Sequence, residues 1–228
     1  MAAFTVCGSA GASLCEAPFM HDGGQAQMTG TGEIRLGADL SFSEVRKNGA
    51  SCEARFQGVA SYGLGGLPAG KTNLNYLMTV KDGKATFARP DGRGGSEPVN
   101  GRFDLRMLGL FAYAERISRP GQTFPALKFQ INVDRKAVQA DPIVVRTGEK
   151  KVGSRQTIST VLGEQACWPI RYTRVIEPTR ATFSGLTLPV PGMTSQVTDW
   201  FCPQVNMVMK QESEQSGVMS VIEVTKLR

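Results

Sequence analysis

Apolar and polar residues alternate along most of the chain. A period of two places the apolar side chains on one face of a β-strand. The clearest alternation covers residues 32–46, 52–62, 73–80 and 127–133, and further apolar runs begin near residues 157, 167, 200 and 218. Turn-forming or Gly- and Pro-containing stretches separate them. Short strands at hairpin spacing, without long helical patterns, predict an antiparallel all-β protein.

One hairpin can be predicted down to its register. The pair Asp82-Gly83 favours a tight type I′ turn between two strands. A two-residue loop there sets Met78 opposite Phe87 and Val80 opposite Ala85, so that both arms carry apolar residues on one face.

A second hairpin needs an irregularity. A two-residue loop at Asn48-Gly49 would pair Phe42 with Arg55 and put the apolar faces of the two strands on opposite sides. We therefore predict a three-residue loop, or a bulge, that sets Phe42 opposite Phe56.

Two segments depart from the strand pattern. Residues 105–118 fit a helical stripe as well as a strand, so the pattern allows one helix. Residues 186–196 contain two prolines beside apolar residues, and we predict an irregular connection there.

The stretch GLGGLPAGKT has the spacing of a phosphate-binding loop, in which Gly65 is followed after four residues by Gly70, Lys71 and Thr72. Such a loop needs a helix after Thr72, because the helix N-terminus supplies unpaired amides. Residues 73–80 alternate instead. We therefore favour a loop between strands, and keep as the alternative a nucleotide-binding enzyme that uses these four residues to bind its cofactor.

Composition and charge indicate an ordinary globular protein. Of 228 residues, 41% are hydrophobic and 20% charged, and no run of eighteen apolar residues could form a transmembrane segment. The net charge is +6, but the basic residues are scattered. We assign them to solvated strand faces and predict no nucleic-acid partner; they include Lys150, Lys151, Arg171, Arg174 and Arg180.

The sequence offers few candidates for catalysis. Its one histidine, His21, sits beside Asp22 in a Gly-rich N-terminal segment, and no Gly-x-Ser-x-Gly motif occurs. The carboxylates, Asp199 among them, show no spacing typical of an acid/base pair. We therefore predict no catalytic residue, no cofactor and no metal site, and a protein that is not an enzyme.

Five cysteines indicate oxidation rather than zinc binding, because none forms a Cys-x-x-Cys pair. If Cys7 belongs to a removed leader, four remain. Cys15 with Cys52 and Cys167 with Cys202 is then the simplest of three connectivities, and the sequence does not choose among them. Free, buried thiols in a cytosolic protein are the alternative.

The N-terminal residues resemble part of a secretion signal. Residues 1–12 end in Ala10-Gly11-Ala12, a small-residue cleavage pattern, but they lack a positively charged start. We interpret residues 1–12 as the remnant of a signal peptide and residues 13–228 as a single antiparallel β domain.

The stretch TDWFCPQVNMVMKQESEQSGVMSVIEVTKL, residues 198–227, resembles the closing hairpin of the TapB-like periplasmic proteins. These are uncharacterised bacterial envelope proteins related in fold to the LolA/LolB lipoprotein carriers. The matching positions are Trp200, Phe201, Pro203, Val208, Lys210 and Glu212. The chain departs from the family with Asn206 in place of a glycine and with the additional thiol of Cys202.

This resemblance implies a curved antiparallel sheet or half-barrel and transfers no functional residues. In carriers of that shape the concave face holds acyl chains. We therefore predict a non-catalytic periplasmic protein of the cell envelope that binds a lipid or another apolar ligand, or an envelope protein partner. A structural or interaction module without a small ligand is a further alternative.

Overall fold

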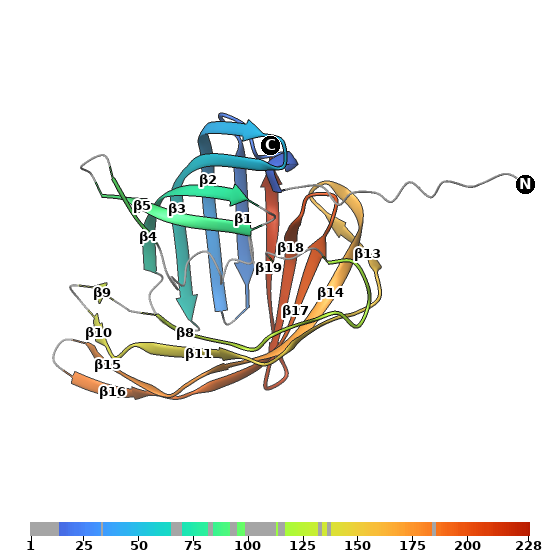
Figure 1. The fold of residues 1–228 in the computed structure, drawn as a ribbon. Helices are drawn as coiled ribbons and strands as arrows, with labels where there is room; N and C mark the ends of the chain where they lie inside the picture. Colours follow the sequence, from blue (N-terminus) through green and yellow to red (C-terminus); the bar gives the residue numbers. More distant parts are fainter. Residues whose placement is uncertain are drawn as a thin grey trace, which may run out of the picture.

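Nearly all the described residues of the computed structural model lie in β-strands or in the turns between them (Figure 1). The structure describes residues 14–32, 34–64, 70–81, 84–91, 95–98, 113, 117–131, 134–135, 138–183 and 186–228. Within these ranges the one helical element is the 3-10 turn η1 (Leu14–Glu16). No helix among them is long and apolar enough to cross a membrane.

The strands pair antiparallel in two sheets. The large sheet follows the order β6 (Ser96–Pro98), β5 (Lys84–Pro90), β4 (Gly70–Lys81), β3 (Ser51–Leu64), β2 (Ile34–Asn48), β1 (Gln25–Thr31), β19 (Val218–Leu227), β18 (Met207–Gln215), β17 (Met193–Cys202), β14 (Gly163–Ile176), β11 (Ile143–Thr147) and β8 (Leu127–Ile131). Three short strands attach to it: β12 (Lys150–Val152) and β13 (Gln156–Thr160) both pair with β14, and β7 (Thr123–Phe124) pairs with β12. The small sheet has the order β16 (Leu186–Val190), β15 (Thr179–Phe183), β10 (Val138–Ala140) and β9 (Asp134–Arg135).

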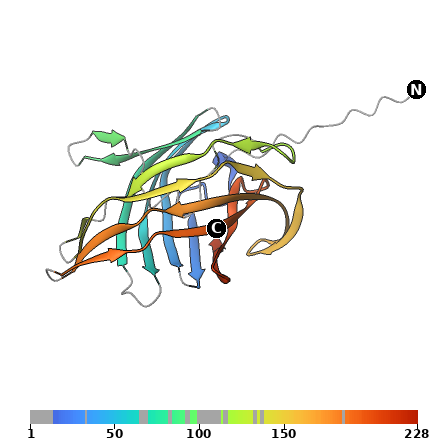
Figure 2. The same cartoon turned by 90° about the horizontal axis from the view of Figure 1, so that it is seen from below.

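The large sheet is open and strongly curved. Its two halves join where β1 pairs with the last strand, β19. Figure 2 shows the yellow and orange strands of the second half running across the blue and teal strands of the first. β6 and β8 lie at the two ends of the strand order. The predicted curved antiparallel sheet is therefore confirmed.

The inner face of this sheet carries the alternating apolar residues of the sequence. Aromatic rings follow one another across its strands, with centroids 4.8 Å apart for Phe19 and Phe42, 6.0 Å for Phe42 and Phe56, and 5.2 Å for Phe56 and Tyr76. All four side chains are buried. Ring pairs at these separations stabilise a core beyond the area that they bury.

The predicted hairpin registers are confirmed. Met78 lies opposite Phe87 and Val80 opposite Ala85 in the β4–β5 pair, although the turn residues 82–83 lie outside the described residues. In the β2–β3 pair Phe42 lies opposite Phe56.

The irregularity in the β2–β3 pair is a bulge. The register shifts between Ser43 and Arg46, and Glu44 adopts a φ of 55°. The Val45 N–H, which the bulge frees from the ladder, donates a hydrogen bond of 2.8 Å to Asp22 Oδ1. One extra residue in β2 thus keeps the apolar side chains of both strands on the same face.

The predicted irregular connection over residues 186–196 is wrong. These residues form β16 and the start of β17, and only Pro191 and Gly192 between them lie outside the strands. Pro189 fits because β16 is an edge strand, where an N–H facing away from its neighbour is not needed for pairing. Of the ambiguous segment 105–118, Tyr113, Ile117 and Ser118 are described, and the question of helix or strand falls on residues outside the described ranges.

Two disulfides close the structure at separate places. Cys15–Cys52 fastens η1 to the start of β3, and Cys167–Cys202 links the neighbouring strands β14 and β17. These bonds are the simplest of the three connectivities that the sequence leaves open. Cys15–Cys52 holds the segment that contains Phe19 against the inner face.

Replacing Cys15 and Cys52 together by serine should lower the free energy of unfolding by about 4 kcal/mol, because the bond closes a long loop in the unfolded chain. The sequence separation of this pair is 37 residues. Urea unfolding followed by circular dichroism measures the change, and reductant added to the wild type should reproduce part of it. An unchanged unfolding midpoint would contradict a stabilising role for this bond.

Candidate functional site: a buried polar band on the inner face

All eight buried polar or charged residues in the described part of the chain lie on six strands of the second half of the sheet. They are Thr147, Lys150, Arg174, Ser195, Asp199, Gln211, Ser213 and Ser220. We call these eight residues the polar band. Buried polar groups are costly unless they are paired, so such a concentration requires an explanation.

Strand alternation places the band on the inner face. In β14 the even-numbered residues Trp168, Ile170, Tyr172 and Arg174 are all buried, whereas Arg171 between them is exposed. Trp168 and Ile170 belong to an apolar cluster, whereas Arg174, the last residue of the series, is charged. The polar band therefore continues an apolar surface instead of lying on a separate face.

Asp199 is the centre of the band. Its side chain is 1% exposed and accepts hydrogen bonds from Tyr113 Oη at 2.6 Å, Gln211 Nε2 at 2.7 Å and Tyr172 Oη at 3.4 Å. Lys150 Nζ lies 3.9 Å from Asp199 Oδ2. Four partners from separate segments thus compensate for the removal of this carboxylate from water.

Tyr113 and Tyr172 contact both the cation and the anion of this ion pair. Lys150 Nζ lies 4.2 Å from the ring centroid of Tyr172 and 4.8 Å from that of Tyr113, while both hydroxyl groups point to Asp199. Burial, followed by the negative charge of Asp199, raises the pKa of both phenols well above the usual value. Both therefore stay protonated and act as hydrogen-bond donors.

The contacts of Arg174 differ from those of Lys150, which lies beside a carboxylate. Its side chain donates to two neutral groups, Gln211 Oε1 at 3.4 Å and Ser213 Oγ at 3.1 Å. Its Nε is buried without a hydrogen-bond partner in the described part of the structure. The Gln211 amide bridges the two charges, because it accepts from Arg174 and donates to Asp199.

The assignment of Lys150 and Arg174 to solvated strand faces is therefore wrong. Lys150 is 7% exposed and Arg174 is 3% exposed. Arg174 continues the buried series of alternate residues in β14, and Lys150 is buried beside the exposed Lys151 in the short strand β12. The signal that could have found the site is this conflict between charge and strand phase, which Asp199 shares.

The candidate phosphate-binding residues are placed in a strand. Gly70, Lys71 and Thr72 begin β4 and pair with Tyr62, Ser61 and Ala60 of β3, whereas Gly65 lies outside the described residues. The helix that a phosphate loop needs after Thr72 is not formed.

The matching positions of the TapB-like hairpin have a structural explanation. Trp200 and Lys210 are cross-strand neighbours, and Glu212 accepts hydrogen bonds from Trp200 Nε1 and from Lys210 Nζ, both at 2.9 Å. Burial alone would raise the pKa of Glu212, but these two hydrogen bonds and the charge of Lys210 hold it below the usual value. The motif thus braces β17 against β18 on the face opposite to Asp199.

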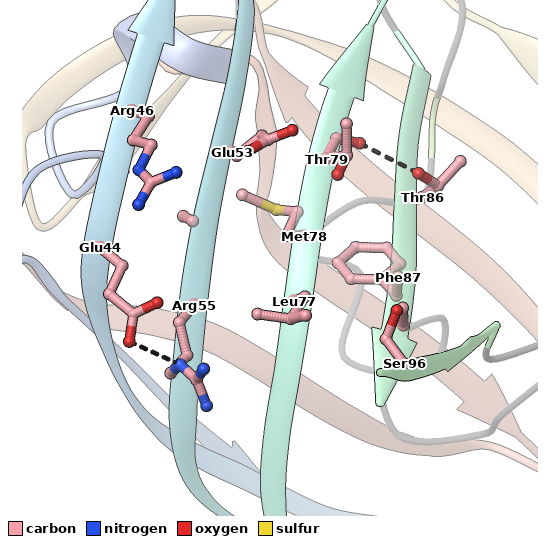
Figure 3. A pocket seen from close by; sticks show the side chains of 12 residues that line it. Glu44, Arg46, Glu53, Arg55, Leu77, Met78, Thr79, Thr86, Phe87 and Ser96 are labelled. Atoms are coloured by element: carbon pink, nitrogen blue, oxygen red, sulfur yellow. Dashed lines mark hydrogen bonds and ion pairs between the residues drawn. The ribbon is translucent and has the colours of Figure 1, made fainter. Parts of the chain in front are cut away.

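A groove of about 520 Å³ is lined by residues of β2 to β6 that come from both faces of the sheet (Figure 3). Its charged lining consists of Glu44, Arg46, Glu53 and Arg55, and Glu44 forms an ion pair of 2.9 Å with Arg55. Two acids face two bases, so the lining has no excess of either sign. This groove therefore gives no reason to expect a charged ligand.

Comparison with known proteins supports the fold and leaves the function open. No family model matches the chain. No curated protein is significantly similar to it either. The resemblance of residues 198–227 to TapB-like proteins therefore stays a prediction.

Several solved structures are similar in shape. A protein described as a lipoprotein, from Parabacteroides distasonis, is 12% identical and matches 93% of this chain and 98% of its own, with a TM-score of 0.52. A protein described as exported, with a YmcC-like fold, from Bacteroides fragilis is 10% identical over 91% of this chain and 96% of its own, with a TM-score of 0.49. A β-barrel-like protein of the DUF1849 domain of unknown function, from Brucella abortus, is 10% identical over 90% and 95%, with a TM-score of 0.33. At these identities the likeness to the Parabacteroides protein shows a shared fold alone.

Asp199→Ala should destabilise the protein by about 3–5 kcal/mol, because it leaves Lys150 buried without its carboxylate. Asp39→Ala is the matched control: Asp39 is exposed on β2, and its replacement should change the free energy of unfolding by less than about 0.5 kcal/mol. Chemical denaturation of both variants measures the difference. Equal effects would show that the Asp199 contacts contribute little to stability.

The protein should lose stability as the pH rises above about 10. Tyr113 and Tyr172 have raised pKa values in the folded state, so the stability present below the unfolded pKa is lost as the pH rises through the folded value. Absorbance of tyrosinate, followed from pH 8 to 13, should show Tyr113 and Tyr172 among the phenols that ionise only as the chain unfolds. The Tyr113→Phe/Tyr172→Phe variant should lack these two late ionisations, and their persistence there would refute the assignment.

Proposed function

We propose that the protein is an exported, non-catalytic binding protein of the bacterial periplasm, which holds an apolar ligand at the inner face of its curved sheet. The observation that supports this proposal best is the inner face itself. Apolar side chains cover it on both sides of the polar band, in the two core clusters of the described residues.

The make-up of this surface suits an irregular apolar ligand. Five buried methionines belong to the larger of the two core clusters: Met20, Met28, Met78, Met207 and Met209. Unbranched, polarisable thioethers adapt to ligands of varied shape at low cost. A lipid acyl chain is the ligand class that such a wall would accept most readily.

Two observations favour export. Disulfides persist in oxidising compartments such as the periplasm and are rare in the cytosol, and the described residues contain two. The Parabacteroides protein that shares its fold is described as a lipoprotein. Both fit a protein that works in the envelope.

The small sheet favours a second candidate function, the binding of an envelope protein partner. On its edge strand β16, Leu186 and Leu188 point to one side and are 62% and 51% exposed. The opposite side is polar, since Thr182 and Thr187 share a hydrogen bond of 2.8 Å there. An exposed apolar side on an edge strand is typical of a protein-binding surface.

Native mass spectrometry of the protein, purified from the periplasm of a bacterial host, tests these functions. We expect a mass short by two disulfides and a small, non-covalent apolar adduct that organic extraction removes and an envelope lipid extract restores. Magnesium and ATP should cause no mass shift. A shift of one ATP would instead support the phosphate-loop alternative.

Leu188→Asp separates the two candidates. It should leave the small adduct unchanged, because Leu188 lies outside the inner face, and it should weaken any protein adduct. If neither the wild type nor this variant takes up a small apolar molecule from the extract, the ligand-binding proposal is wrong.

A further inference from the structure

We propose that Arg174 binds the carboxylate of a long-chain fatty acid whose acyl tail lies along the apolar inner face. This inference rests on the proposed function, because it identifies the head group of the apolar ligand. It depends on four features of the described residues: the charge of the polar band, the hydrogen bonds of Arg174, its apolar surroundings and its route to solvent.

The band has an excess of positive charge. Its eight residues include two cations, Lys150 and Arg174, and one carboxylate, Asp199. Asp199 already accepts three hydrogen bonds and lies beside Lys150. The guanidinium of Arg174 is therefore the charge in the band without a carboxylate of its own.

The hydrogen bonds of Arg174 leave capacity for an anion. A guanidinium carries five N–H donors in a planar fork that fits a carboxylate in a bidentate manner. Arg174 uses Nη1 and Nη2 on an amide and a hydroxyl, while its buried Nε has no partner among the described residues. Arg174 is only 3% exposed, and these two hydrogen-bond partners are neutral. Burial of its charge lowers the stability of the protein, and a bound anion would compensate for this loss.

The surroundings of Arg174 fit a fatty acid better than a small, hydrated anion. On the same face, one position beyond Arg174 along the strands, lie Val145, Ile176 and Met193, which are cross-strand neighbours. Val197 lies on the other side, opposite Tyr172. A single excess charge among apolar side chains matches a singly charged head group on an apolar tail.

The row of residues that contains Arg174 reaches solvent. Cross-strand pairing leads from Arg174 to Ser195, and Ser195 Oγ donates to Gln215 Oε1 at 3.5 Å. Gln215 pairs with Val218, which is 41% exposed. The turn between β18 and β19 is therefore the route by which a ligand would enter.

The test compares two ligands of equal chain length, dodecanoate and dodecanol, by isothermal titration of the delipidated protein at pH 8. The wild type should bind dodecanoate at least about tenfold more tightly, as expected for a charge-assisted hydrogen-bonded pair. Acetate should not bind measurably, since it lacks the tail. Tight binding of acetate would show a plain anion site and overturn the fatty-acid assignment.

Arg174→Gln should abolish the preference for dodecanoate over dodecanol, because the neutral amide offers the carboxylate no charge-assisted pair. Arg171→Gln is the matched control, because Arg171 lies on the same strand but is exposed on the opposite face, and it should keep the preference. A preference that survives in Arg174→Gln overturns the inference.

Wild-type measurements keep the inference testable even if Arg174→Gln does not fold. Dodecanoate should raise the unfolding temperature of the wild type more than dodecanol does. Equal binding of both ligands would refute the role of Arg174 while leaving the proposed function intact. Binding of neither ligand would refute the proposed function as well.

Discussion

A buried carboxylate holds the second half of this sheet together. Asp199 on β17 receives hydrogen bonds from β14, from β18 and from Tyr113, and it lies beside the Lys150 ammonium of β12. A charge withdrawn from water must keep all its partners, since the loss of one leaves the others uncompensated. This requirement fixes the relative positions of strands that an apolar core would hold less specifically. It also explains why the polar band can lie beside two apolar clusters.

Arg174 shows the other consequence of burial. Among the described residues, the Gln211 amide lies between its guanidinium and the Asp199 carboxylate, so the two charges are linked by hydrogen bonds and are not in direct contact. An apolar residue at this position would avoid the cost of burying a charge, and Ile176, the next residue on the same face of β14, is apolar. Retention of a cation in such surroundings fits a binding function, in which the ligand supplies the missing charge. The proposed envelope location and the apolar inner face both agree with this binding function.

Much of the fold followed from local patterns. The period of two predicted the strands, and the requirement for one common apolar face predicted both the β4–β5 register and the bulge in β2. The prediction of an irregular connection over residues 186–196 fails at β16, because an edge strand tolerates Pro189. The prediction of a curved sheet rests on the resemblance of the last hairpin to a protein family and not on any single residue.

The site was missed for a physical reason. Lys150, Arg174 and Asp199 lie in three different strands, and no spacing in the sequence shows that they meet on one face. The prediction that Lys150 and Arg174 lie in solvent follows from their charge and not from their positions in the strands. The measurement that tests the account most directly is a crystal structure with dodecanoate bound. The account predicts the carboxylate within hydrogen-bonding distance of the Arg174 guanidinium, with the tail beside Ile176 and Met193. Dodecanoate bound in the groove lined by Arg46 and Arg55, with Arg174 unchanged, would contradict it.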